Sequence, residues 1–155
     1  MTMLFRVSRL IVSLALAAST AVWAIHPWTT GGVSPFSNVN DAEGLAITIE
    51  DESVSSTGAT LRFENATDRE WEFGEEFWIE KKEDGEWKEL KSLRTGAYNA
   101  LSYLLKPHST REEAYSFSDI YGHLTNGEYR LVKELLRERS GGWESRYLAA
   151  EFSVS

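Results

Sequence analysis

The chain has 155 residues, with 24 acidic side chains against 16 Lys and Arg, no cysteine and a net charge of −8. Nucleic acid and anionic lipid surfaces are disfavoured as partners, because phosphate contacts need clustered basic side chains. The lack of cysteine excludes disulfides, Cys-ligated metals, thiol nucleophiles and lipidation at a cysteine.

The first segment has the composition of a secretory signal. Arg6 and Arg9 precede an apolar run over residues 10–18, and Ala24 ends a short stretch of the kind that signal peptidase accepts. We expect residues 1–24 to be a signal peptide, which places the rest of the chain outside the cytoplasm. An uncleaved anchor is the alternative, because residues 10–28 carry no charge and about 20 residues cross a bilayer. That segment would then be the only membrane contact.

The remainder divides into a lead-in and one domain. Residues 25–44 are rich in Thr, Gly, Ser, Asn and Pro without a period, which predicts a flexible segment. Residues 45–155 show short runs of alternating apolar and polar side chains separated by turn residues. This pattern predicts an all-β domain, an antiparallel β-sandwich of about seven strands. The expected strands lie near residues 45–49, 59–64, 77–82, 86–90, 101–105, 113–117, 128–136 and 148–154.

A hairpin is expected around Gly85. A two-residue Asp84-Gly85 turn would set Lys81 against Lys88 and place two glutamates opposite each other. A three-residue loop over residues 83–85 instead pairs opposite charges, with Gly85 in a left-handed bulge. The charge pattern therefore favours the three-residue loop.

The most informative stretch surrounds Tyr129. Gly122 and Gly127 mark a loop corner, and alternation begins directly after it. A tyrosine at this position is typical of a corner in which the ring is buried and the hydroxyl bonds to the loop backbone. The segment 97–105 fits both a short helix and a strand. We favour the strand, because Gly96 and Pro107 leave too few residues for a stable helix.

Four stretches of the chain, FGEEFWIEKKEDGEW, SYLLKP, IYGHLTNGEYRLVK and YLAAEFSV, together resemble a bacterial immunoglobulin-like domain family found in secreted and surface-attached proteins. The resemblance spans residues 45–154. It implies an Ig-like sandwich and an envelope location, with no common activity, cofactor or catalytic residues to carry over.

The sequence offers little catalytic chemistry. His26, His108 and His123 are scattered without metal-ligand spacing, and no nucleophile motif of the G-x-S-x-G type is present. The acidic pairs at residues 75–76 and 83–84 lack a calcium-loop pattern and suit a solvated surface better. We therefore expect no enzyme activity, no cofactor and no metal site.

Trp143 is the main candidate for ligand contact. It follows a Gly141-Gly142 pair in a predicted mobile loop over residues 137–145, and three basic side chains accompany it: Arg137, Arg139 and Arg146. Tryptophan and arginine are favoured anchors at interfaces. The alternative is that Trp143 folds back over the sheet edge.

These features predict a non-enzymatic, extracytoplasmic module of the cell envelope that binds an unknown protein or cell-wall polymer. The alternative is a small secreted protease inhibitor that inserts the 137–145 loop into a protease. A rigid loop would be needed for that role, and the glycines argue against one. A hydrolase ranks third.

Overall fold

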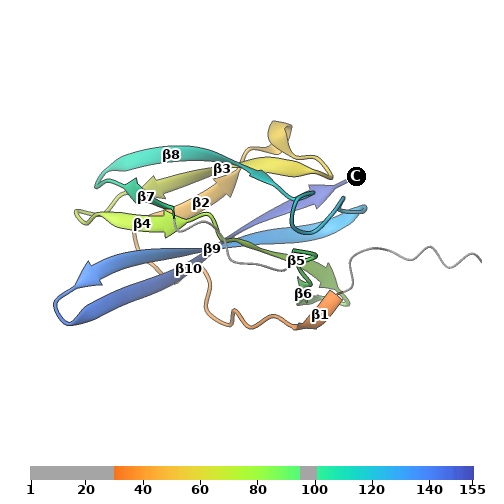
Figure 1. Cartoon of the computed structure of the whole chain (residues 1–155), viewed down its shortest axis with the longest axis horizontal. Helices are drawn as coiled ribbons and strands as arrows, with labels where there is room; N and C mark the ends of the chain where they lie inside the picture. Colours follow the sequence, from red (N-terminus) through yellow and green to blue (C-terminus); the bar gives the residue numbers. More distant parts are fainter. Residues whose placement is uncertain (1–29, 95–100) are drawn as a thin grey trace, which may run out of the picture.

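The computed structural model describes residues 30–94 and 101–155, so the predicted leader, residues 25–29 and residues 95–100 lie outside the described chain. In the described residues, the chain forms ten strands and one 3-10 turn at Asp51–Ser53. Figure 1 shows the strands arranged in two layers. The strands are β1 (Thr30–Val33), β2 (Leu45–Ile49), β3 (Gly58–Asn65), β4 (Trp71–Gly74), β5 (Trp78–Glu83), β6 (Glu86–Leu90), β7 (Ser102–Leu105), β8 (Ser109–Ser116), β9 (Gly127–Arg139) and β10 (Gly142–Val154).

All the strands pair antiparallel, as predicted. One sheet has the order β1-β6-β5-β9-β4-β7, with β10 paired to the other edge of β9, and the second has the order β2-β3-β8. The sequence suggested about seven strands, with eight segments that could form them, whereas the described chain has ten. Two of the additions, β1 and β4, were not predicted, because a four-residue strand shows too few alternations to be recognised. The strand predicted within residues 97–105, in preference to a short helix, is confirmed by β7.

The core lies between the two sheets and is rich in aromatic rings. Phe63 of β3 stacks on Phe73 of β4 with ring centroids 3.9 Å apart, which ties the sheets together. Phe152 of β10 stacks on both Phe117 and Tyr129. Stacked pairs of this kind add to the free energy gained from burying apolar area.

The predicted tyrosine corner is present. Tyr129 is fully buried, and its hydroxyl donates a hydrogen bond of 2.8 Å to the carbonyl of Thr125 in the loop behind it. Gly122 has a φ of 77°, which is the left-handed conformation that glycine adopts without strain. The local pattern was sufficient here because the hydrogen bond spans only four residues.

The predicted register of the β5–β6 hairpin is wrong. Lys81 pairs with Lys88 and Glu80 with Glu89, around a two-residue turn in which Asp84 and Gly85 both have positive φ. Such a turn matches the twist of the strands. The apparent charge clashes are relieved elsewhere: Glu80 pairs with Arg130 of β9 at 2.5 Å. Two lysines of the hairpin also form ion pairs. Lys82 lies 3.6 Å from Glu128 of β9, and Lys88 lies 3.6 Å from Glu83 of β5.

We predict that Gly85→Ala destabilises the fold by about 1 kcal/mol, because its φ of 80° strains any residue with a side chain. An added methyl group meets no atom within 4 Å, so backbone strain is the only cost. Gly32 is the matched control: it also has open space but lacks a left-handed backbone, so Gly32→Ala should be neutral. Denaturant unfolding measures both. An equal change in the free energy of unfolding for the two variants would contradict a left-handed turn residue at Gly85.

The described part of the predicted lead-in, residues 30–44, contacts the domain at several points. β1 pairs with β6, and Phe36 packs against the rings of Trp78 and Tyr147. The side chain of Asn40 then makes two hydrogen bonds to β10: it donates to the carbonyl of Ala149 and accepts from the backbone N–H of Ala149. These contacts could not be predicted from the sequence, because the partners lie more than 40 residues away along the chain.

A buried lysine lies at the centre of β9. Lys133 is fully buried, and its amine donates hydrogen bonds of 2.6 and 2.5 Å to the carbonyls of Gly74 and Glu76. The rings of Phe73 and Tyr115 flank the amine. Burial lowers the pKa of Lys133 to about 7, against the opposing effect of four nearby carboxylates, those of Glu76, Glu75, Glu113 and Glu134.

This lowered pKa predicts a stability that rises with pH. The unfolded chain keeps the ordinary lysine value of 10.5, so above about pH 7 it binds more protons than the folded chain. The free energy of unfolding should therefore increase by up to about 1 kcal/mol per pH unit between pH ~7 and ~9.5. Lys133→Met should remove that slope. Denaturant titrations of both proteins across this range provide the measurement, and parallel slopes would contradict the assignment.

Candidate functional site

The segment predicted as a mobile loop is a paired hairpin. β9 and β10 form one continuous ladder from Gly127↔Val154 to Arg139↔Gly142, and only Ser140 and Gly141 remain for the turn. Gly141 has a φ of 92°, so it supplies the left-handed residue of that turn. The sequence concealed these strand ends because their alternation is between charged and polar residues, without an apolar face.

The strand geometry divides the four candidate residues between two faces of the hairpin. Side chains alternate along a strand, and residues directly opposite each other share a face. Arg137 is opposite Glu144, so Arg137, Arg139 and Arg146 lie with that glutamate on one face. Trp143 is opposite Glu138 on the other face. The structure therefore brings the arginines together but sets the tryptophan across the strand from them.

Glu144 contacts all three arginines, and this role was not predicted from the sequence. Its carboxylate contacts Arg137 through Nη2, lies 2.6 Å from Arg146 and 3.6 Å from Arg139. The hydrogen bond from Arg137 is the main cause that lowers the pKa of Glu144. One carboxylate thus balances three guanidinium groups. Knowledge of the strand register would have revealed it, because Glu144 is the direct cross-strand partner of Arg137.

Arg137 also joins the hairpin to β4. Its guanidinium lies 5.0 Å from the ring centre of Trp71, which is only 5% exposed. Cation–π contacts of this kind are favourable when the cation is partly desolvated. Arg137 is therefore held in place from two sides, by Glu144 and by Trp71.

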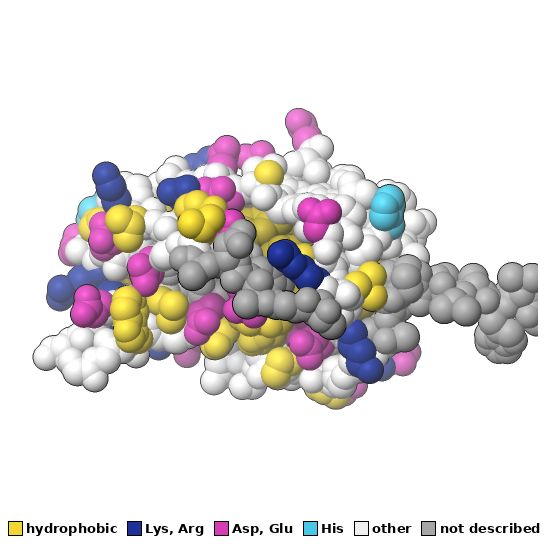
Figure 2. All heavy atoms as spheres, viewed as in Figure 1, with side chains coloured by type: hydrophobic (Ala, Val, Ile, Leu, Met, Phe, Trp, Pro, Cys, Tyr) yellow, Lys and Arg dark blue, Asp and Glu magenta, His cyan; other side chains and the backbone are white. Residues whose placement is uncertain are grey.

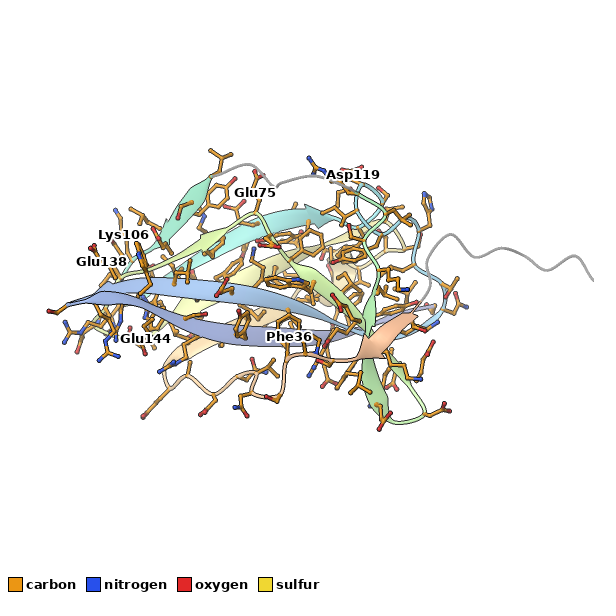
Figure 3. The ribbon with its side chains drawn as sticks, turned by 60° about the horizontal axis from the view of Figure 1, so that its bottom comes forward. Phe36, Glu75, Lys106, Asp119, Glu138 and Glu144 are labelled. Atoms are coloured by element: carbon orange, nitrogen blue, oxygen red, sulfur yellow. The ribbon has the colours of Figure 1, made fainter. Side chains whose placement is uncertain are left out.

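A groove of about 550 Å³ opens between the end of the hairpin and β4. Trp143, at its rim, is 62% exposed, so it does not fold back over the sheet edge. Figure 2 shows basic, acidic and hydrophobic side chains interleaved at this end of the molecule, and Figure 3 shows Glu138 and Glu144 near the tip. The lining residues are Arg69, Glu70, Trp71, Glu72, Leu104, Leu136, Arg137, Glu138, Arg139, Ser140 and Trp143.

His108 and the acidic pairs noted in the sequence do not line this groove. His108 pairs with Asp68 at 2.7 Å on the surface. Glu83 belongs to the β5–β6 hairpin, where it pairs with Lys88. Glu75 accepts a hydrogen bond from Tyr103. Within residues 30–94 and 101–155, no three His, Cys, Asp or Glu side chains are grouped so as to hold a metal ion.

The described chain also contains no helix with the length and apolar character needed to span a bilayer. The predicted anchor alternative, residues 10–28, falls outside the described residues.

The sandwich topology and the corner at Tyr129 define an immunoglobulin-like domain. The bacterial Ig-like domain family matches residues 41–153, and the chain belongs to that family. The comparisons with curated proteins and with solved structures gave no match. The resemblance noted in the sequence is thereby confirmed, and membership suggests an interaction module rather than an enzyme.

We predict that Trp143→Ala changes the free energy of unfolding by less than about 0.5 kcal/mol, since the side chain is largely in solvent. Trp71 is the internal comparison, because it lines the same groove but is buried. Trp71→Ala should cost about 3–5 kcal/mol. Chemical denaturation of both variants provides the measurement. A loss of several kcal/mol at Trp143 would make it a packing residue.

Proposed function

We propose that this protein is a non-catalytic binding module of the bacterial cell envelope, acting outside the cytoplasm. Its partner is a protein or a cell-wall polymer, and the contact is made at the end of the β9–β10 hairpin. One observation carries the proposal: Trp143 stands 62% exposed at the rim of a groove. Large aromatic side chains exposed beside a groove are favoured as binding anchors.

The form of the hairpin supports this role. The ladder between β9 and β10 continues to the tip at Arg139. Nearer the middle of β10, the side chain of Asn40 bonds Ala149. A binding surface built on paired strands loses little conformational entropy when a partner docks. The arginines beside it are held by Glu144, so their positions are also fixed before binding.

The location is supported by the sequence and the family. Arg6 and Arg9 precede an apolar run of signal-peptide type, and bacterial Ig-like domains are often surface-exposed. The absence of cysteine is compatible with this location, because stability rests on the aromatic core and not on disulfides.

The test is a comparison of matched variants. Full-length protein with a C-terminal tag would be expressed in its own cells, cross-linked and recovered from the envelope. Trp143→Ala should reduce the recovered partner by at least about tenfold. Val33→Ala is the control, since Val33 is also exposed but lies on β1, in a different part of the sheet. Equal recovery from wild type and both variants would contradict the proposed surface.

The protease-inhibitor alternative is tested in parallel. The hairpin tip is a two-residue turn between paired strands, whereas an inhibitor presents an extended segment to the protease cleft. We expect no inhibition of trypsin-like or subtilisin-like proteases. Inhibition at nanomolar concentration that is lost on Arg139→Ala would replace the binding-module assignment with an inhibitor.

A further inference from the structure

The groove contains an unpaired edge of β9. One edge of this strand is paired with β10 along its whole length, and the other is paired with β5 from Tyr129 to Val132. β4 then pairs at a single position, Glu72↔Leu136. In the described part of the chain, no strand is paired to this edge between Leu136 and Arg139. Figure 1 shows β4 and β9 diverging toward the hairpin end.

The free edge presents backbone hydrogen-bonding groups to the groove. In an antiparallel ladder, the N–H and C=O of successive residues point alternately to the two edges of the strand. Arg139 and Gly142 close the two-residue turn as a hydrogen-bonded pair, so the N–H and C=O of Arg139 point to β10. Those of the preceding residue, Glu138, therefore point to the opposite edge, on the β4 side. Glu138 lines the groove, and Leu136 lies beside it.

We propose that the groove binds an extended acidic peptide segment, which adds as a strand along the free edge of β9 opposite Glu138. This inference rests on the proposed function and specifies the chemistry of the partner. A peptide strand uses its own backbone to satisfy the open N–H and C=O, and its side chains then fall alternately on the two faces of the hairpin.

The two faces differ in charge, and that difference specifies the peptide pattern. The residue opposite Glu138 would place its side chain on the face of Trp143, where Glu138 would repel an acidic group. Its two neighbours would point to the face of Arg137 and Arg139. There, three arginines share the single carboxylate of Glu144. The preferred sequence is therefore acidic–apolar–acidic.

Of the three arginines that contact Glu144, Arg139 is the most available to the peptide. Its side chain is 61% exposed, and its contact with Glu144 is long at 3.6 Å. Arg137, by contrast, is held closely by Glu144 and stacked on Trp71. On the opposite face, Leu104 and Leu136 line the groove with Trp143, so an apolar central side chain finds apolar neighbours there.

The probe is a capped synthetic peptide, Thr-Glu-Val-Glu-Thr, titrated into isotope-labelled full-length chain and followed by NMR. We expect the largest shifts at the amide of Glu138 and the indole of Trp143. A peptide N-methylated at the central valine cannot donate the strand hydrogen bond and should show no saturable shift. The peptide Thr-Val-Glu-Val-Thr, with its acid on the wrong face, should bind at least about tenfold more weakly.

Protein variants complete the test. Arg139→Glu should weaken binding of the first peptide about tenfold, equivalent to about 1.4 kcal/mol. Arg62→Glu, at an exposed arginine on β3 in the other sheet, is the matched control and should leave the affinity unchanged. Unchanged affinity on Arg139→Glu, equal binding of the N-methylated peptide, shifts that map away from Glu138, or no binding of any peptide would each overturn the inference.

A soluble peptidoglycan fragment is titrated as a separate arm. If this fragment binds the groove and the peptides do not, the peptide inference fails while the proposed function stands. If the peptides fail and Trp143→Ala also leaves partner recovery unchanged, both fail.

Discussion

The arrangement of the larger sheet depends on the amine of Lys133. The edge of β9 that faces away from β10 is shared by two strands, β5 along its first half and β4 near Leu136. The connection between β4 and β5 passes over the gap, and its carbonyls at Gly74 and Glu76 receive the hydrogen bonds of Lys133. Without that donor, the two carbonyls would lose this hydrogen-bond partner at the point where the two strands separate.

Separation of the two strands also creates the groove. Because β4 bends away after a single pair with β9, the end of the β9–β10 hairpin continues alone, and Trp71 and Arg137 cover the base of the opening. Trp71 leaves its indole N–H buried without a hydrogen-bond partner in the described residues. The same divergence that requires a buried amine in the core thus leaves an open strand edge at the surface.

The sequence predicted those features whose partners are close along the chain. The corner at Tyr129 bonds Thr125, four residues away, and the alternation around it was plain. The β5–β6 register was mispredicted because its charges are balanced by β9, as Glu80 with Arg130 demonstrates. Long-range pairing of this kind has no local signature.

The site was predicted in composition but not in geometry. Trp143 and the three arginines were recognised as residue types that favour binding, yet their division between two faces requires the register of β9 and β10. Glu144 was overlooked because a glutamate among charged residues usually marks solvated surface. Its role follows only from its position opposite Arg137.

The first strand has a mechanical consequence. β1 is joined to β6 by only two registered pairs with an irregularity between them, whereas the β9–β10 ladder has thirteen. A pull on the chain ahead of Thr30, with the hairpin tip held by a partner, would load β1 first, and its hydrogen bonds would open one after another. Peeling β1 would lengthen the chain ahead of the domain while leaving the aromatic core packed, because no residue of that core lies in β1.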